Sequence, residues 1–461
     1  MEHPKTLIDQ LATLSPSVGD PEEIAGYEVD SADVTIPRMH RVSVSKQHLQ
    51  SLVMTLRSVP RLAEMEGGIA HHSPSGQGSI SLDSIAHWLL AQARTCPPEE
   101  CVGRLMGAVE KNESPLLEIV PVWGISPRDS IDLGEGIKIV PIQDLPPSRL
   151  KDLFTGKKRH RFSFDIANSS PRPGAAIVKE TVHGPLYESS TSEAASASRR
   201  QGELMLSALM APTEAEKQAA FAEMAKTMDP LKAARESTSI YDIAEELALV
   251  VALCTARPIF PLGQWYQRPI NLPLVGTLGG YSGPTNDHPF YIPVDQQDYP
   301  VAEIEALVQR YRSLDPHTRR RLKTPLSRLN QGRRQQAHHT VEAAAIDLGI
   351  AAEALLTQDR DRDAPISFTL RARGTLLLNG TSEERRRNYE VLRNLYEIRS
   401  KVAHEGSIVD RTNIPHSERD RVRLREVSTT IRSAEAVCIA LVRKIIETGQ
   451  FPSWDALMFG W

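Results

Sequence analysis

The sequence predicts a multidomain α+β protein, in which an N-terminal mixed α/β region with a β-rich segment precedes a C-terminal all-α helical bundle. The chain has 461 residues, which is more than one compact core of ordinary size holds. Ile and Val are concentrated between residues 115 and 187, and these residue types favour strands. From residue 300 onwards the apolar residues recur at helical spacing instead.

Three consecutive parts are therefore expected. The first is a mixed α/β domain at 1–190, which is β-rich over 115–187. A helical and Pro/Gly-rich connecting region follows at 191–299, and the all-α domain occupies 300–461. From residue 301 the chain has 27 Lys and Arg against 21 Asp and Glu, a net charge of +6, whereas residues 1–300 have a net charge of −10. The C-terminal part is thus the better candidate for an anionic partner.

The composition is typical of a soluble protein, with 40% hydrophobic and 24% charged residues. The longest apolar run, LALVVALCTA at 247–256, is about half of the ~20 residues that cross a bilayer. We expect it to form a buried helix. The N-terminus, MEHPKTLIDQLATLSPS, lacks the pattern of a secretory signal. A cytoplasmic location and no membrane partner are therefore expected.

Cysteines are few and scattered, which argues against a disulfide framework. Cys96 and Cys101 flank PPEE, but no second Cys or His pair follows at ligand spacing. We expect ordinary thiols, no metal site and no cofactor.

Three segments in the β-rich stretch carry the strand pattern. They are LEIVPVWGI at 117–125, IDLGEGIKIVPI at 131–142 and GAAIVKETV at 174–182. Gly134 and Gly136 supply a hairpin-type break within the second segment.

The C-terminal third reads as successive helices. A helix over 301–314 stops at Asp315-Pro316, and Pro316 opens the next one. Further helices are expected over 341–356 and through 368–378.

Asn379-Gly380 ends the helix through 368–378, and the residues from Thr381 to Glu384 provide capping chemistry for another. The last long helix, about 417–447, has an apolar stripe that needs a partner helix, in the same subunit or in another. The stripe consists of Val427, Ile431, Ala434, Cys438, Leu441 and Ile445.

An Arg followed five positions later by His, R-x4-H, occurs five times, although about one match is expected by chance. Two matches cross prolines and are expected to be solvated loop pairs. Two others lie in the polar junction GRRQQAHHT, and the fifth lies in LYEIRSKVAHEG. The matches are Arg312/His317, Arg411/His416, Arg333/His338, Arg334/His339 and Arg399/His404.

The pair Arg399/His404 is distinguished by its helical register. Arg399 falls within an apolar stripe, and a guanidinium aimed at a core or an interface needs an anionic or hydrogen-bonding partner. His404 comes just before Glu405-Gly406, where the helix should end. The structural alternative is that Arg399 pairs with a carboxylate such as Glu353, while His404 only caps the helix. The expected stripe consists of Tyr389, Leu392, Leu395, Tyr396, Val402 and Ala403.

The residues around this pair resemble the HEPN family, in particular its Apea-like branch, whose members carry an LYxxRSxxxH-type helix. Matching positions are Leu395, Tyr396, Arg399, Ser400 and His404. Three further segments look similar to the family in the same order: DLGIAAEALL with Glu353, FTLRARGTLL with Arg371, and the closing GQFPSWDALMFG. The resemblance covers roughly residues 316 to 461.

The resemblance implies an all-α bundle that usually dimerises and, in catalytic members, a metal-independent endoribonuclease. Arg399 and His404 would form the catalytic pair, with Ser400 as the adjacent polar residue. A His can move a proton to or from the ribose and leaving oxygens, and Arg can bridge phosphate oxygens as charge builds. The expected products are a 2′,3′-cyclic phosphate and a 5′-OH. Members modified by a partner nucleotidyltransferase carry Tyr two positions after the His, where this chain has Gly406.

Phosphate contacts are expected first in HTRRRLK at 317–323, and a solvated helix face is the equally weighted alternative. The candidate RNA-binding residues are Arg319, Arg320, Arg321, Lys323, Arg333, Arg334 and Lys401. Lys401 could instead form an exposed ion pair with Glu397.

Expected partners are RNA, a second copy of the chain through the HEPN helices, and a protein or phage-derived trigger for the N-terminal region. The resemblance also suggests an effector of anti-phage defence, and the alternative is a non-catalytic scaffold that dimerises or binds nucleic acid or a ligand.

Overall fold

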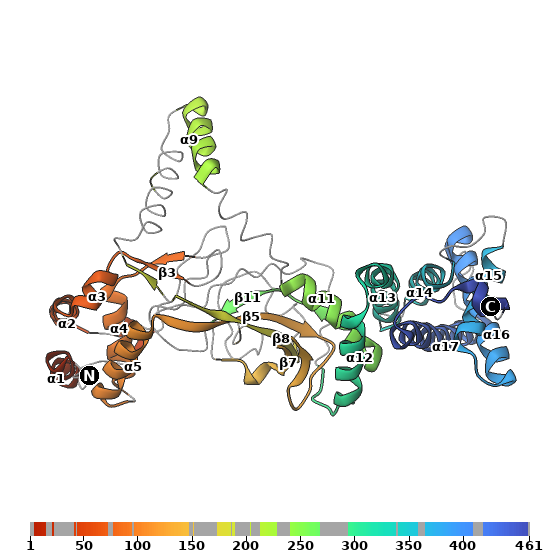
Figure 1. Ribbon diagram of the computed structural model, residues 1–461, viewed down its shortest axis with the longest axis horizontal. Coiled ribbons are helices and arrows are strands. Elements are labelled where there is room, and N and C mark those ends of the chain that lie inside the picture. Colours follow the sequence, from red (N-terminus) through yellow and green to blue (C-terminus); the bar gives the residue numbers. More distant parts are fainter. Residues whose placement is uncertain are drawn as a thin grey trace.

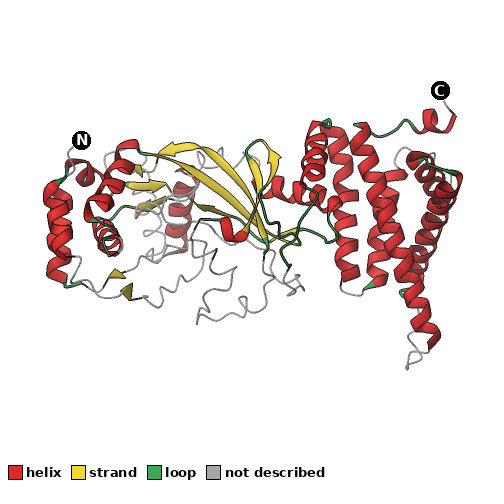
Figure 2. Cartoon of the chain, turned by 90° about the horizontal axis from the view of Figure 1, so that it is seen from below, coloured by secondary structure: helices red, strands yellow, loops and turns green. Residues whose placement is uncertain are grey.

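A computed structural model of the chain has a group of helices at each end and an antiparallel sheet between them (Figures 1 and 2). This arrangement confirms the mixed α+β class. The structure describes residues 4–14, 21–22, 41–42, 44–71, 77–94, 96–146, 151, 173–185, 187–189, 203, 213–227, 240–267, 294–337, 340–357, 365–408 and 418–459.

The N-terminal helices form a separate core. Two antiparallel groups of short strands accompany them, one of β1 and β2 and one in the order β4-β3-β9. Apolar side chains such as Leu11, Leu56 and Leu89 are fully buried between the helices. The elements are α1 (Lys5–Leu14), α2 (Lys46–Ser58), α3 (Pro60–Met65), α4 (Leu82–Gln92), α5 (Pro98–Lys111), β1 (Pro21–Glu22), β2 (Arg41–Val42), β3 (Ile69–His71), β4 (Gln77–Ser79) and β9 (Tyr187–Glu188).

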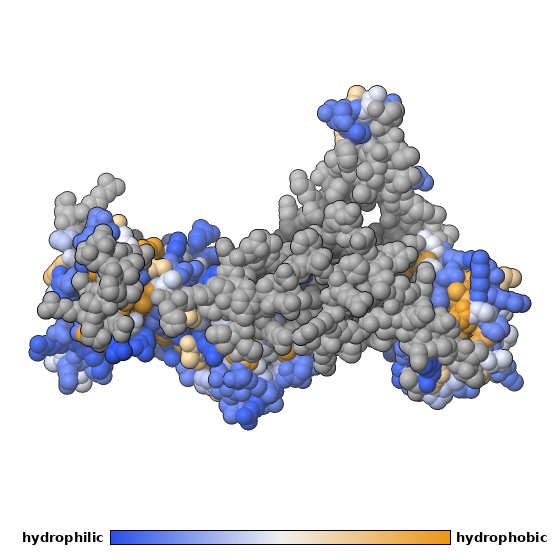
Figure 3. Space-filling view, turned by 180° about the vertical axis from the view of Figure 1, so that it is seen from behind, coloured by the Kyte–Doolittle hydropathy of each residue, from blue (hydrophilic) through white to orange (hydrophobic). Residues whose placement is uncertain are grey.

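The surface over these N-terminal helices includes apolar side chains. Figure 3 shows hydrophobic surface gathered there, at the right of the view. Met54 on α2 contributes to the apolar surface of this region, since 67% of the residue is exposed.

The central sheet has six antiparallel strands in the order β10-β5-β8-β7-β6, with β11 also paired to β5. The three expected strand segments are confirmed. Gly134, Glu135 and Gly136 join β6 to β7 with positive φ angles of 81°, 52° and 72°, a conformation that glycine adopts without strain. The strands are β5 (Glu113–Trp123), β6 (Ile131–Gly134), β7 (Ile137–Pro141), β8 (Ala175–Pro185), β10 (Phe260–Pro261) and β11 (Trp265–Gln267), and a 3₁₀ turn, η2 (Ile142–Asp144), follows β7.

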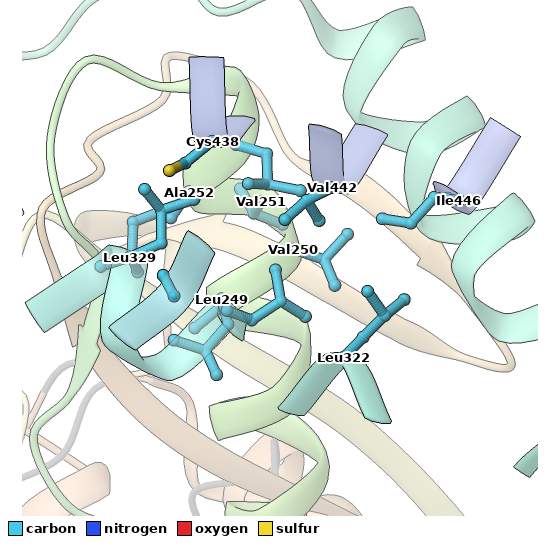
Figure 4. Packing of buried hydrophobic residues seen from close by; sticks show 14 of the residues in the cluster. Leu249, Val250, Val251, Ala252, Leu322, Leu329, Cys438, Val442 and Ile446 are labelled. Atoms are coloured by element: carbon cyan, nitrogen blue, oxygen red, sulfur yellow. The ribbon is translucent and has the colours of Figure 1, made fainter. Parts of the chain in front are cut away.

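The connecting region contributes α9 (Glu214–Thr227), α11 (Ile240–Val251) and a 3₁₀ turn, η3 (Ala252–Cys254). The apolar run in α11 is buried, as its composition predicted. Side chains of α11 pack beside Leu322 and Leu329 on one neighbouring helix and Val442 on another (Figure 4). The expected boundary near residue 300 therefore does not coincide with a division of the hydrophobic core, which continues from the sheet into the C-terminal helices.

The C-terminal part consists of helices in the described residues, as expected. The helix at 382 begins with a capping box, in which Thr381 and Glu384 satisfy each other's backbone N–H groups. The helices are α12 (Val301–Ser313), α13 (Pro316–Ala337), α14 (Val341–Leu356), α15 (Ile366–Leu378), α16 (Ser382–Glu405), α17 (Glu418–Thr448) and α18 (Trp454–Phe459). No helix among the described residues has the length and apolar character needed to cross a membrane.

The apolar stripe of α17 is buried along its whole length, from Val427 to Ile445. Its partners are α13, α14 and α16 of the same chain. Of the two alternatives for this stripe, the structure thus favours packing within one subunit, and the stripe no longer gives a reason to expect a second copy.

Candidate active site

Arg399 lies on the side of α16 that packs against α14. Its Nη2 atom is 3.2 Å from Oε2 of Glu353, and 29% of the Arg399 side chain and 20% of the Glu353 side chain remain exposed. The ion pair offered as the structural alternative is therefore present. Because Arg399 has five N–H donors and only this one bond to a described residue, part of its guanidinium is available to another acceptor.

Only one of the two carboxylate oxygens of Glu353 accepts a hydrogen bond in this pair. Its Oε1 atom is buried and has no hydrogen-bond partner among the described residues. A carboxylate and a guanidinium can form two parallel hydrogen bonds, whereas this pair forms one. Glu353 therefore holds the Arg399 guanidinium at one N–H donor, and the other N–H donors are not bonded to a described residue.

Gly349 allows the aliphatic part of Arg399 to lie against α14. A Cβ atom at position 349 would be 2.7 Å from Cγ and 3.1 Å from Cβ of Arg399. One turn further along α14, Glu353 meets the guanidinium. A glycine and a glutamate four residues apart therefore hold the two ends of one side chain.

Replacing Gly349 with alanine is expected to destabilise the fold by about 1–3 kcal/mol, because overpacking forces neighbouring groups to move. The measurement is urea-induced unfolding. Gly107→Ala is the matched control, since position 107 is also inside a helix but has no heavy atom within 4 Å of the added Cβ. This control should stabilise by about 0.4–1 kcal/mol, and equal effects of the two variants would contradict the described packing.

His404 occupies the last turn of α16 and is exposed to solvent. The helix ends at Gly406, which has a φ of 74° and donates its N–H to the Val402 carbonyl at 2.8 Å. The imidazole makes no hydrogen bond or ion pair with a described residue. Ser400, which follows Arg399 directly in the sequence, is half-buried.

The rest of the expected stripe is mostly confirmed by burial. Leu392, Leu395 and Val402 are buried, and Tyr396 packs partly buried against the core. The exception is Ala403, which is exposed and does not belong to the buried side.

Arg333 is buried and structural, which contradicts its expected role as a phosphate contact. Its side chain is 6% exposed, and its Nε lies 2.5 Å from Oε1 of Glu435. Nη2 donates to the Thr255 carbonyl at 2.7 Å, and Nη1 donates to the Ala252 carbonyl. These three groups enclose the guanidinium, so that no face remains for a nucleic acid.

The sequence did contain a signal for this burial. Arg333 continues the spacing of Leu322, Leu326 and Leu329, which form the buried side of α13. Arg333, like Arg399, therefore falls in the apolar register of its helix.

The other candidate phosphate contacts differ in their burial and in whether they already contact another side chain. Arg321 stacks over the Phe451 ring at 4.0 Å, and Arg334 lies over the Phe260 ring at 5.5 Å. Arg319 is half-buried. Arg320 and Lys323 are exposed and form no ion pair with a described residue.

Lys401 forms an ion pair within α16. Its Nζ atom is 3.6 Å from Oε2 of Glu405. The alternative partner Glu397 instead pairs with Arg393, also at 3.6 Å.

The candidate phosphate contacts on α13 and the candidate catalytic residues on α16 lie on different sides of α14. Gly332 of α13 packs against Leu348, whereas the adjacent residue Gly349 packs against Arg399. Figure 1 likewise places α13 on one side of α14 and α16 on the other. The structure therefore does not bring the two sets together on one surface.

Of the remaining R-x4-H matches, only Arg312/His317 lies wholly within the described residues. Arg312 forms an ion pair with Glu135, with 3.0 Å between its Nη1 atom and Oε2. His338, His339 and the whole of the match at 411–416 lie outside the described residues.

No family model, curated protein or solved structure matches the chain. Function is therefore inferred from the residues themselves and from their resemblance to the HEPN family.

Proposed function

We propose that the chain is a metal-independent endoribonuclease of HEPN type, in which Arg399 and His404 act on the RNA backbone. The observation that supports this most directly is that the Arg399 side chain is held in place while part of its guanidinium remains unbonded. Glu353 and Gly349 hold its side chain, yet one edge of the guanidinium stays open. His404 lies exposed at the end of the same helix.

The roles follow from the chemistry of the groups. His404 accepts the proton of the ribose 2′-OH or delivers one to the leaving 5′-oxygen. Arg399 stays cationic and stabilises the charge that builds on the phosphate oxygens. Ser400, between them, supplies a further hydroxyl close to the reacting groups, and Lys401 offers a nearby positive charge.

A second copy of the chain completes this site. Five residues along an α-helix correspond to a rotation of about 140° and a rise of about 7.5 Å. Arg399 faces α14 while His404 faces solvent, so the two groups do not converge within one chain. Pairing two α16 helices across a groove would place the His404 of one copy beside the Arg399 of the other.

The dimer is tested by sedimentation of the full chain. We expect a dimer at micromolar concentration, and a monomer under these conditions would contradict this part of the proposal.

The biological setting is proposed from the resemblance alone. The chain would act in the cytoplasm as an effector of prokaryotic anti-phage defence, and the acidic N-terminal part would recognise a protein or phage-derived trigger.

A non-catalytic HEPN scaffold is the alternative, and the Glu353–Arg399 ion pair favours it, because a structural pair needs no substrate. The test is to incubate the purified protein with labelled RNA in EDTA. Cleavage that leaves 2′,3′-cyclic phosphate ends and spares DNA of the same sequence supports the enzyme. RNA that stays intact, including tRNA, supports the scaffold.

A further inference from the structure

Helix α13 has an unusual charge distribution. Between Pro316 and Ala337 it contains seven Lys and Arg residues and no Asp or Glu. Its buried side packs against α11, α14 and α17. Apart from the buried Arg333, the positive charges of α13 therefore lie on the rest of its circumference.

The exposed side forms a continuous stripe, which we call the α13 stripe. Its members recur at three- and four-residue steps, so they lie along one side of the helix. From the first to the last they span about 12 Å along the axis. The α13 stripe consists of Arg320, Lys323, Thr324, Ser327 and Arg328, all of them exposed.

Most of these side chains are available to a partner. Arg320, Lys323, Thr324 and Ser327 make no hydrogen bond or ion pair with a described residue. On α17, by contrast, Thr429 Oγ1 donates to a carbonyl one turn earlier at 3.0 Å, as do other hydroxyls of that helix.

Asp315 and Asp347, two acidic groups that contact α13, are already hydrogen-bonded. Asp315 caps α13, because its Oδ1 accepts the backbone N–H groups of His317 and Thr318 at 2.9 and 3.0 Å. Asp347 accepts a bond from Nη1 of Arg328 at 2.9 Å, while 47% of the Arg328 side chain remains exposed. The stripe itself therefore presents cations and hydroxyl groups but no carboxylate.

This set of groups fits a sugar–phosphate backbone. Arg, Lys, Ser and Thr side chains are the usual donors to phosphate oxygens, and such contacts do not depend on base sequence. A length of about 12 Å covers more than one phosphate of a strand.

We propose that the α13 stripe is a second, sequence-independent site for the backbone of a polynucleotide, separate from the groove of Arg399 and His404. The separation follows from α14, which lies between the two sites. That the polynucleotide is RNA rests on the proposed function. The substrate class is then an RNA long enough to reach both sites, since a fragment of a few nucleotides cannot contact both at once.

The test removes two charges from the stripe with Arg320→Gln and Lys323→Gln together. The matched control, Arg57→Gln with Arg104→Gln, removes two charges from exposed arginines of the N-terminal helices. Both pairs are placed in full-length chains carrying His404→Ala, so that RNA stays intact. The probes are a 30-nucleotide single-stranded RNA, the same sequence as DNA, and a 5-nucleotide RNA.

Loss of two phosphate contacts should reduce the slope of log affinity against log salt by about 1.4, since each contact on a single strand contributes about 0.7. We expect an affinity loss of about tenfold or more for the 30-nucleotide RNA and an equal loss for the DNA. The 5-nucleotide RNA and the control variant should show no change.

An unchanged salt slope, or a loss confined to RNA, would overturn the backbone site. This result is separable from the proposed function. If the parent chain cuts RNA in EDTA while the stripe variant binds normally, only the stripe proposal fails. If the parent chain binds RNA through the stripe but does not cut it, only the ribonuclease proposal fails.

Discussion

Replacing His404 with alanine is expected to lower the rate of RNA cleavage by about 10²–10⁴-fold, the usual contribution of a general acid or base. The free energy of unfolding should stay within about 0.5 kcal/mol of the parent value, because the side chain is exposed and makes no hydrogen bond or ion pair with a described residue. Cleavage is measured with labelled RNA in EDTA, and stability is measured by urea-induced unfolding.

The control for this variant is His317→Ala. His317 belongs to another R-x4-H match and is also exposed, but its partner Arg312 is paired with Glu135. The control should cleave a short RNA at the parent rate. Equal losses in the two variants, or full activity of His404→Ala, would remove the basis for assigning His404 to the reaction.

Replacing Arg333 with alanine is expected to cost about 3–5 kcal/mol of stability, which is typical when one partner of a buried ion pair is removed. The variant leaves Glu435 without its cation, removes the Arg333 donor from the Thr255 carbonyl, and removes one of the donors to the Ala252 carbonyl. Those carbonyls belong to the first residue of η3 and to the residue after the turn, so the contact between the connecting region and the C-terminal helices should loosen first.

The adjacent residue provides the control for this prediction. Arg334 stacks over Phe260 at 5.5 Å, and a partly exposed cation–π contact contributes about 0.5–1 kcal/mol. Arg334→Ala should therefore unfold at a urea concentration close to that of the parent chain. If both variants lose the same stability, the buried network around Arg333 is not what holds these elements together.

Arg333 and Arg399 show what helical register can and cannot predict about a side chain. For Arg399, the apolar stripe of its helix predicts a guanidinium directed at a packed surface, and the carboxylate it meets there is Glu353. Arg333 follows the same rule on α13, but its place in a run of polar residues suggested a phosphate contact instead. Register predicts which side of a helix is covered, and only the surrounding elements decide what covers it.

The α17 stripe illustrates the same limit. Its spacing required a partner helix, and this requirement is met. The spacing does not reveal whether that helix belongs to the same chain, because the apolar surface of a neighbouring helix is equivalent in either case. Burial against α13, α14 and α16 decides for the same chain.

Helix and strand positions were determined by the local sequence. The signals that place them are local: the spacing of apolar residues, prolines, glycines and capping residues each influence only a few neighbouring positions. The strands around Gly134 and the start of α16 at Thr381 could therefore be located without tertiary information. The same local signals singled out LYEIRSKVAHEG as a helix that carries an arginine on its apolar side.

Tertiary structure alone decided which residues far apart in sequence meet. It placed α11 in one core with the sheet and the C-terminal helices, enclosed Arg333 between Glu435 and the η3 carbonyls, and put α14 between Arg399 and the α13 stripe. These outcomes depend on the packing of whole helices, whose free energy is a sum over many weak contacts between distant segments. For this reason a motif of a few residues could nominate Arg399 and His404, but it could not predict what surrounds them.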